Sequence, residues 1–115
     1  FYPQGFGYES TDVPFKVNAK EGDSLQYDSI SDIIEISFTG IAGDFTLFLP
    51  LASDFPYRIL SIVNDQTVNP SNKILITAIN GETIDGLSVY TLNKAYNGIQ
   101  VWSDGTQWIV IQAKG

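Results

Sequence analysis

Short runs of β-branched and aromatic residues, separated by turn-forming residues, recur along the chain from Val13 onward. Such runs favour strands, and the Gly, Asn, Asp and Pro clusters between them favour tight turns. No window sustains the period of an amphipathic helix. The pattern therefore predicts an all-β domain, an antiparallel sandwich or small barrel of about eight short strands. The predicted strands are residues 13–17, 33–38, 45–49, 57–63, 73–79, 88–92, 98–102 and 107–112.

A chain of 115 residues is long enough for one domain and too short for two separate cores. We predict an extended N-terminal arm over residues 1–12 and a single β-sandwich domain over residues 13–115. The chain begins at Phe1 rather than at methionine, which suggests a C-terminal piece of a longer polypeptide.

Composition argues against several partners. The net charge is −7 and the six basic residues are scattered, whereas binding to nucleic acid needs clustered Lys and Arg. No apolar run approaches the roughly 18 to 20 residues that span a bilayer, so we expect no membrane insertion.

Catalysis is also disfavoured. The chain has no histidine and no cysteine, which removes Ser-His-Asp and Cys-His nucleophiles and thiolate metal sites. Asp28 with Asp32, and Glu82 with Asp85, are pairs of carboxylates close in sequence, but solvated turn residues are the simpler interpretation. The oxygen-rich segments 64–66 and 69–72 could suit calcium, yet they lack the spacing of known calcium loops. We therefore predict no enzyme, no metal and no cofactor.

The last two predicted strands flank Asp104-Gly105, a pair suited to a two-residue type I′ turn. This turn predicts a register in which Ser103 faces Thr106 and Val101 faces Trp108. One face of the hairpin is then apolar and predicted to be core. It holds Ile99, Val101, Trp108 and Val110.

The opposite face of this hairpin is mixed rather than polar, and several other predicted strands are also apolar on both sides. One core of this size would leave such a second face exposed, and large exposed apolar patches mark interfaces. We therefore predict an obligate oligomer, with barrel closure within one chain as the alternative. The predicted subunit interface consists of Trp102, Gln107, Ile109 and Ile111.

Six segments, spread over about residues 13 to 112, form an ordered set: 45–50 (FTLFLP), 57–65 (YRILSIVND), 73–77 (KILIT), 81–86 (GETIDG), 90–93 (YTLN) and 101–111 (VWSDGTQWIVI). In this order they resemble the C-terminal β-domains of phage tail-fibre and virion spike receptor-binding proteins. Tyr57 stands where the resemblance predicts glycine.

The resemblance implies a jelly-roll-like sandwich that forms a homotrimer at the virion surface and carries adhesion to a host cell, without catalysis. It also implies that Asp85 and Gly86 form a turn above Thr83 and Ile84. The alternatives are a structural trimerisation or capping domain of a fibre, and a monomeric carbohydrate-binding module.

A host glycan or protein is the expected partner. Sugars stack on aromatic rings and exchange hydrogen bonds with Asn, Asp and Gln side chains. The candidate ligand-binding residues are Tyr96, Asn97, Asn69 and Asn72. Trp102 is a further candidate for stacking, although packing at the subunit interface is the favoured role for it.

Overall fold

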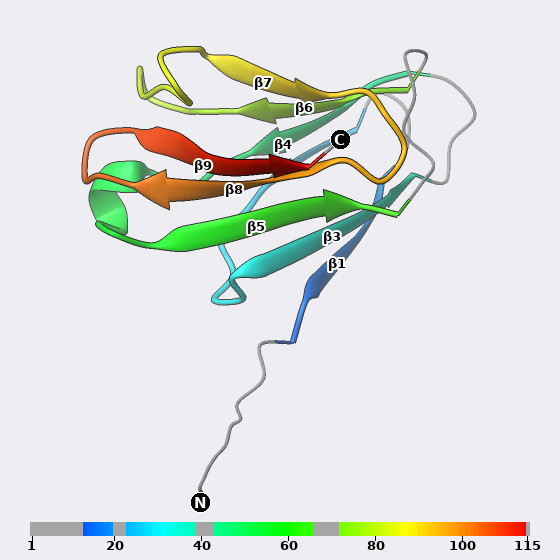
Figure 1. The fold of residues 1–115 in the computed structure, drawn as a ribbon, viewed down its shortest axis with the longest axis horizontal. Helices are drawn as coiled ribbons and strands as arrows, with labels where there is room; N and C mark the ends of the chain where they lie inside the picture. The colour runs from blue at the N-terminus through cyan, green and yellow to red at the C-terminus, as the bar shows by residue number, and fades with distance from the viewer. Residues whose placement is uncertain (1–12, 20–22, 39–42, 66–71, 115) are drawn as a thin grey trace, which may run out of the picture.

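The computed structural model describes residues 13–19, 23–38, 43–65 and 72–114. Their strands form two sheets that pack face to face (Figure 1). One sheet has five strands in the order β1-β3-β5-β8-β9, and the other has four in the order β2-β4-β6-β7. The elements are β1 (Phe15–Ala19), β2 (Ser24–Gln26), β3 (Ile33–Phe38), β4 (Phe45–Phe48), the 3₁₀ turn η1 (Ala52–Asp54), β5 (Ile59–Asn64), β6 (Ile74–Thr77), β7 (Val89–Leu92), β8 (Gly98–Ser103) and β9 (Trp108–Lys114).

The first six strands wind as a coil. Consecutive strands alternate between the two sheets, so that β1, β3 and β5 lie parallel in one sheet and β2, β4 and β6 lie parallel in the other. After β6 the direction changes, because β7 pairs antiparallel with β6, β8 with β5, and β9 with β8. The coil therefore ends in an antiparallel segment.

The expectation of a purely antiparallel sandwich is thus wrong for the first half of the domain. Both sheets are mixed, with four parallel and three antiparallel pairs of strands. Alternating side chains specify which face of a strand is buried, but they do not specify the direction of its neighbour. The prediction of an all-β domain with two packed layers is confirmed, and the predicted arm over 1–12 lies outside the described residues.

The core lies between the sheets and is built from the inward side chains of both. Trp108 is fully buried, and its indole N–H donates to the carbonyl of Pro50 at 3.0 Å. Tyr27 is buried as well and meets the ring of Phe15 edge to face, with the centroids 5.2 Å apart. The other fully buried large side chains are Ile34, Ile36, Leu47, Leu49, Leu60, Ile62, Ile74, Ile76, Ile84 and Leu92.

The hairpin between β8 and β9 has the predicted faces but not the predicted register. Ser103 is the neighbour of Trp108, and Val101 is the neighbour of Val110, so the loop has four residues instead of two. The Asp104 side chain accounts for the longer loop, because its Oδ1 accepts the backbone N–H groups of Thr106 at 2.8 Å and Gln107 at 2.9 Å. From Ser103 to Val101 the shift is two residues, which keeps these side chains on their predicted faces, and beyond the irregularity between Gln100 and Val101 it is three.

The two-residue turn with positive φ angles occurs instead at Asp85-Gly86, where φ is 51° and 81°. Ile84 and Leu87 exchange backbone hydrogen bonds of 2.7 and 2.9 Å across it. Ile84 is buried beneath the turn. The turn implied by the family resemblance is confirmed at this position.

Candidate functional site

The outward surface of β5, β8 and β9 combines exposed apolar groups with hydrogen-bonding groups. We call this surface the outer face of the five-stranded sheet. Its cross-strand neighbours form rows: Ile59, Trp102 and Ile109 in one row, and Val63, Gly98 and Lys114 in another. Between them lie Ser61, Gln100 and Gln112. Along the strands, the face therefore begins with an apolar row, continues with an uncharged polar row and ends with the row that contains Gly98 and Lys114.

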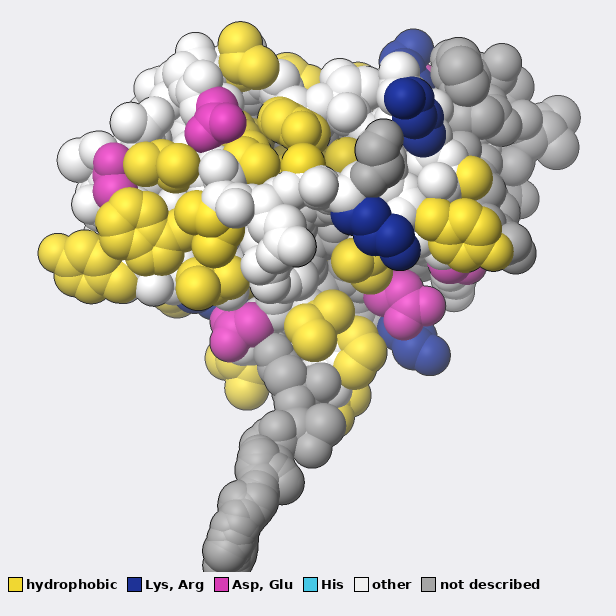
Figure 2. Space-filling model, in the orientation of Figure 1, with side chains coloured by type: hydrophobic (Ala, Val, Ile, Leu, Met, Phe, Trp, Pro, Cys, Tyr) yellow, Lys and Arg dark blue, Asp and Glu magenta, His cyan; other side chains and the backbone are white. Residues whose placement is uncertain are grey.

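An aromatic platform stands at the apolar end, formed by Tyr57, Ile59, Trp102 and Ile109. The rings of Tyr57 and Trp102 stack, with their centroids 6.1 Å apart and their planes 29° from parallel. The Tyr57 side chain is 72% exposed and Ile59 is 44% exposed. Figure 2 shows hydrophobic side chains gathered at the left of this view, near the ends of β5 and β8 next to η1. The platform is thus open to solvent.

The backbone holds Tyr57 in an uncommon conformation. Its φ is +69°, in the left-handed region that favours glycine and carries a strain of about 1–3 kcal/mol for other residues. The N–H of Tyr57 donates to the carbonyl of Ser103 at 2.8 Å, and the N–H of Ser103 donates to the carbonyl of Arg58 at 2.9 Å. These bonds tie the segment to β8, which places the Tyr57 ring beside Trp102.

Arg58 supports the same end of the domain. Its Nε donates to Asp32 Oδ1 at 2.9 Å, and its Nη2 donates to the carbonyls of Ser29 at 3.1 Å and Ser31 at 2.9 Å. The guanidinium also lies 4.9 Å from the centroid of the Phe55 ring. One arginine thereby fixes the connection before β3 against the segment that carries Tyr57. The base of the platform is therefore held by hydrogen bonds as well as by packing.

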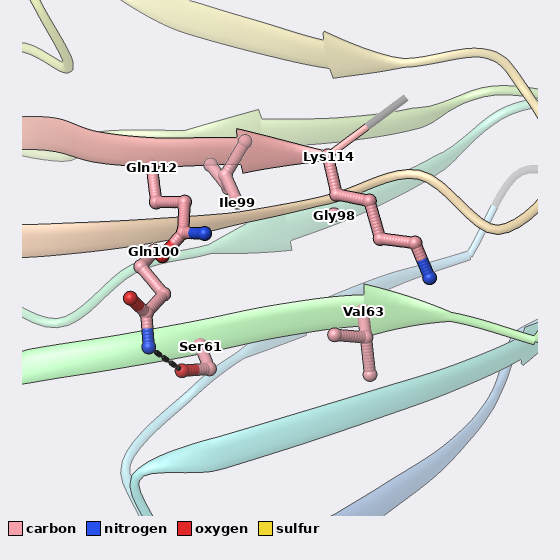
Figure 3. Close-up of a pocket in the computed structure, with 7 residues that line it drawn as sticks. All are labelled: Ser61, Val63, Gly98, Ile99, Gln100, Gln112 and Lys114. Atoms are coloured by element: carbon pink, nitrogen blue, oxygen red, sulfur yellow. Dashed lines mark hydrogen bonds between the residues drawn. The ribbon is translucent and has the colours of Figure 1, made fainter.

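A hollow of about 210 Å³ lies further along the same face (Figure 3). Its floor is at Gly98, where a side chain would bring Cβ to 2.7 Å from the carbonyl oxygen of Ile62. Glycine therefore permits the close approach of β8 to β5 and leaves the space above it open. On its rim, Gln100 Nε2 donates to Ser61 Oγ at 3.0 Å. The lining residues are Ser61, Val63, Gly98, Ile99, Gln100, Gln112 and Lys114.

The charge of the hollow is opposite to that of the whole chain. Lys114 is the one charged residue among the seven that line it, whereas the chain carries a net charge of −7. Figure 3 shows the Lys114 side chain reaching from the end of β9 past Gly98 towards β5. The hollow therefore combines a mainly apolar lining with amide and hydroxyl groups and one ammonium group, which suits a ligand with an apolar side, hydroxyl groups and a negative charge.

The structure brings together none of the predicted ligand-binding residues on this face. Tyr96 is 57% exposed in the loop before β8, and its N–H donates to Asn64 Oδ1 at 2.9 Å. Asn97 Oδ1 accepts from Asn64 Nδ2 at 3.0 Å, so its side chain holds the loop. Asn72 is 4% exposed and thus withdrawn from the surface, and Asn69 lies outside the described residues.

The predicted interface residues divide into two groups. Trp102 and Ile109 are neighbours in the aromatic platform, and Ile111 is 50% exposed beside the irregularity in the pairing of β8 and β9. Gln107 lies in the hairpin loop, where its Oε1 accepts the hydroxyl of Thr83 at 2.9 Å. Three of the four side chains thus remain outward, and the interface itself stays a prediction.

Two of the described carboxylates hold backbone N–H groups of the fold. Glu82 accepts the N–H groups of Ala52 at 2.6 Å and Ser53 at 3.2 Å, which caps η1. The backbone N–H groups of Thr106 and Gln107 hold the pKa of Asp104 below its ordinary value. Among the residues that the structure describes, no three His, Cys, Asp or Glu side chains lie close enough to hold a metal ion. Within the same residues, no helix is long and apolar enough to cross a membrane.

Sequence reasoning missed Tyr57 and Gly98 as elements of a site. For Tyr57 there was a signal, because the family resemblance predicts glycine at this position and the structure shows a positive φ there. For Gly98 the signal was weaker, since a glycine within a strand indicates a close approach of backbones only when its neighbours are known. Searches with protein-family models and among curated proteins found no match for the chain.

Proposed function

We propose that this chain is a non-catalytic receptor-binding domain of a homotrimeric viral or phage fibre or spike, which adheres to a glycan or protein on the host cell. The supporting observation is the exposed aromatic platform beside a hollow that carries amide, hydroxyl and ammonium groups, both on one face. Binding sites combine an apolar surface with a few hydrogen-bonding groups that fix orientation. The location of such a domain is the virion surface.

The strain at Tyr57 supports a binding role. A bulky residue at positive φ opposes folding, and such residues cluster at functional sites. Stacking on Trp102 fixes the ring before any ligand arrives, which lowers the entropy lost on binding. A residue selected for stability alone at this position would be glycine.

For the trimer, we assign contacts between copies to the outer face of the four-stranded sheet. Its outward residues form two cross-strand rows, and none of the eight is charged although 17% of the chain is. Charged residues are depleted at the centre of protein interfaces. The rows are Ser24-Thr46-Leu75-Thr91 and Gln26-Phe48-Thr77-Val89.

This assignment leaves the aromatic platform and the hollow free for the host. Three copies would present three equal sites at one tip. If all three engage one cell, avidity raises the apparent affinity by about 10² to 10⁴ without a new contact.

Adhesion is tested by measuring how fluorescently labelled domain binds to a panel of intact bacterial and eukaryotic cells. We expect saturable binding to at least one cell type, competed by unlabelled domain. Saturable binding that is equal for wild type and for Trp102→Ala would show that adhesion does not use the aromatic platform. The absence of saturable binding throughout a broad panel would contradict the proposed function.

Assembly is tested by sedimentation velocity at micromolar concentration. We expect a trimer for the wild type and for Ile111→Glu, and a monomer for Leu75→Glu. A trimer that dissociates only in Ile111→Glu would move the interface to the outer face of the five-stranded sheet, as the sequence predicts. A monomeric wild type would contradict the trimer.

A structural capping domain is the second candidate, and the topology favours it on one point. The strands β7, β8 and β9 follow the parallel coil. Because β7 and β8 pair antiparallel with the last parallel strand of each sheet, no further parallel strand can be added there. A cap of this kind needs no exposed aromatic platform. Trimers without cell binding would support the cap.

A further inference from the structure

We infer that the outer face of the five-stranded sheet binds a linear acidic oligosaccharide, which lies along β8 from the aromatic platform to the hollow at Gly98. This inference rests on the proposed adhesion function and names its ligand. The two parts of the site lie on one strand, with Trp102 at one end and Gly98 at the other. Both belong to the outer face, as the pairing of β8 with β5 shows.

The platform recognises a sugar ring through its apolar side. A pyranose presents C–H groups on one side, and these pack on the exposed ring of an aromatic residue. Tyr57 is 72% exposed, and its ring stacks on Trp102 with the centroids 6.1 Å apart. A flat aromatic surface in this position favours a ring-shaped ligand over an extended peptide, which would use the free edge of a strand.

The polar row supplies hydrogen bonds to hydroxyl groups. The side-chain amide of Gln100 donates to Ser61 Oγ at 3.0 Å and keeps its own carbonyl as an acceptor. Gln112 on β9 is the cross-strand neighbour of Gln100. Amides and hydroxyls both donate and accept, which matches the mixed character of sugar hydroxyls. None of these three groups is charged, so their desolvation costs less than that of carboxylates.

The length of the site indicates an oligosaccharide. Trp102 and Gly98 are four residues apart in an extended strand, a distance of about 13 Å. One sugar ring cannot contact both the platform and the hollow. A linear chain of several rings can do so, provided that it follows the direction of β8.

The hollow selects for negative charge. Lys114 is the one charged residue in its lining, and Figure 3 places its ammonium group beyond the amides, towards Val63. A chain with a net charge of −7 repels anions at long range, so a carboxylated sugar must be held by a local cation. We therefore expect uronic or other carboxylated sugars to bind better than neutral ones.

The inference is tested with an array of linear oligosaccharides, neutral and carboxylated, of one to six sugars. We expect binding to carboxylated chains of three or more sugars. Isothermal titration with the best carboxylated chain should then give at least a tenfold loss of affinity for Trp102→Ala. Lys114→Gln should reduce the preference for carboxylated over neutral chains about fivefold or more. Ile30→Ala, at a position that is 96% exposed and belongs neither to this site nor to the proposed trimer interface, is the control and should bind like wild type.

Each contrary outcome identifies which statement is wrong. If cells bind the domain but no oligosaccharide does, adhesion stands and the inference is overturned in favour of a protein receptor. Equal binding of neutral and carboxylated chains overturns the role of Lys114. Should Trp102→Ala lose binding because it is misfolded, its circular dichroism would reveal this, and Tyr57→Gly then tests the platform with the backbone relaxed. Wild-type affinity in a folded Trp102→Ala overturns the site.

Discussion

The two faces of β8 and β9 show opposite physical properties although they belong to the same two strands. The inner face carries Trp108 and Val101, which are fully buried and fixed by packing against the other sheet. The outer face carries Trp102, which is partly exposed, and Ile111, which is 50% exposed, and no second layer of the described residues covers them. The comparison assigns stability to the inner face of the sheet and leaves the outer face free for the recognition that we propose.

The largest effect on stability should come from the inner face. Trp108→Ala removes a fully buried side chain and leaves the carbonyl of Pro50 without its indole donor. We expect the free energy of unfolding to fall by about 3–5 kcal/mol, measured by urea denaturation. Ile111→Ala on the same strand is the matched control and should change it by less than about 1 kcal/mol. Similar losses for both variants would break the comparison.

The second effect concerns a buried polar group that joins the inner side of β5 to the loop before β8. Asn64 is 5% exposed and donates from Nδ2 to the carbonyls of Lys94 and Asn97. Asn64→Ala should lower the free energy of unfolding by about 1–3 kcal/mol, because the loop loses its buried partners. Hydrogen exchange should quicken at residues 94–97. Unchanged exchange there would show that the loop is held by other contacts.

A third prediction has the opposite sign, and it belongs to the outer face. Tyr57→Gly relieves the positive φ but loses the stacking on Trp102. We expect the free energy of unfolding to rise by about 0.5–1 kcal/mol, since the strain exceeds the stacking energy. Tyr57→Phe keeps both and should match wild type. A marked loss of stability in Tyr57→Gly would mean that the platform serves the fold.

The smallest effect is a dependence on pH at the loop that joins the two strands. Hydrogen bonds from Thr106 and Gln107 lower the pKa of Asp104, so its contribution to stability is present above 3.8 and is lost as the pH falls through the lower folded value. Unfolding measured between pH 5 and about pH 2 should therefore show a shallower slope for Asp104→Asn than for wild type. Equal slopes would show that the Asp104 carboxylate does not contribute to the pH dependence of stability.

The sequence predicted which face of a strand is buried better than it predicted the direction in which neighbouring strands pair. The bounds of β3 were predicted as they occur, and the inward side of β8 was correct, because a period of two residues defines a buried side directly. β2 was missed, since Ser24–Gln26 contains a single apolar residue. The parallel direction of the coil could not be predicted, because it depends on how loops cross between sheets and not on the alternation within any strand.

The candidate site was predicted only in part. Trp102 was recognised as an outward residue and as a candidate for stacking, whereas Gln100 was not singled out. The hollow arises from three strands and from the space above Gly98, so no local pattern contains it. Tyr57 joins the site because backbone hydrogen bonds bring it to Ser103, a contact between residues far apart in sequence.

The most direct test of the account is an NMR titration of the ¹⁵N-labelled domain with the carboxylated oligosaccharide that binds best on the array. We predict that amide shifts change along β5, β8 and β9, strongest near Trp102 and Gly98, while residues 46–48 and 75–77 of the four-stranded sheet stay unchanged. Shifts centred on the four-stranded sheet, with those at Trp102 unaffected, would contradict the assignment of recognition to the outer face of the five-stranded sheet.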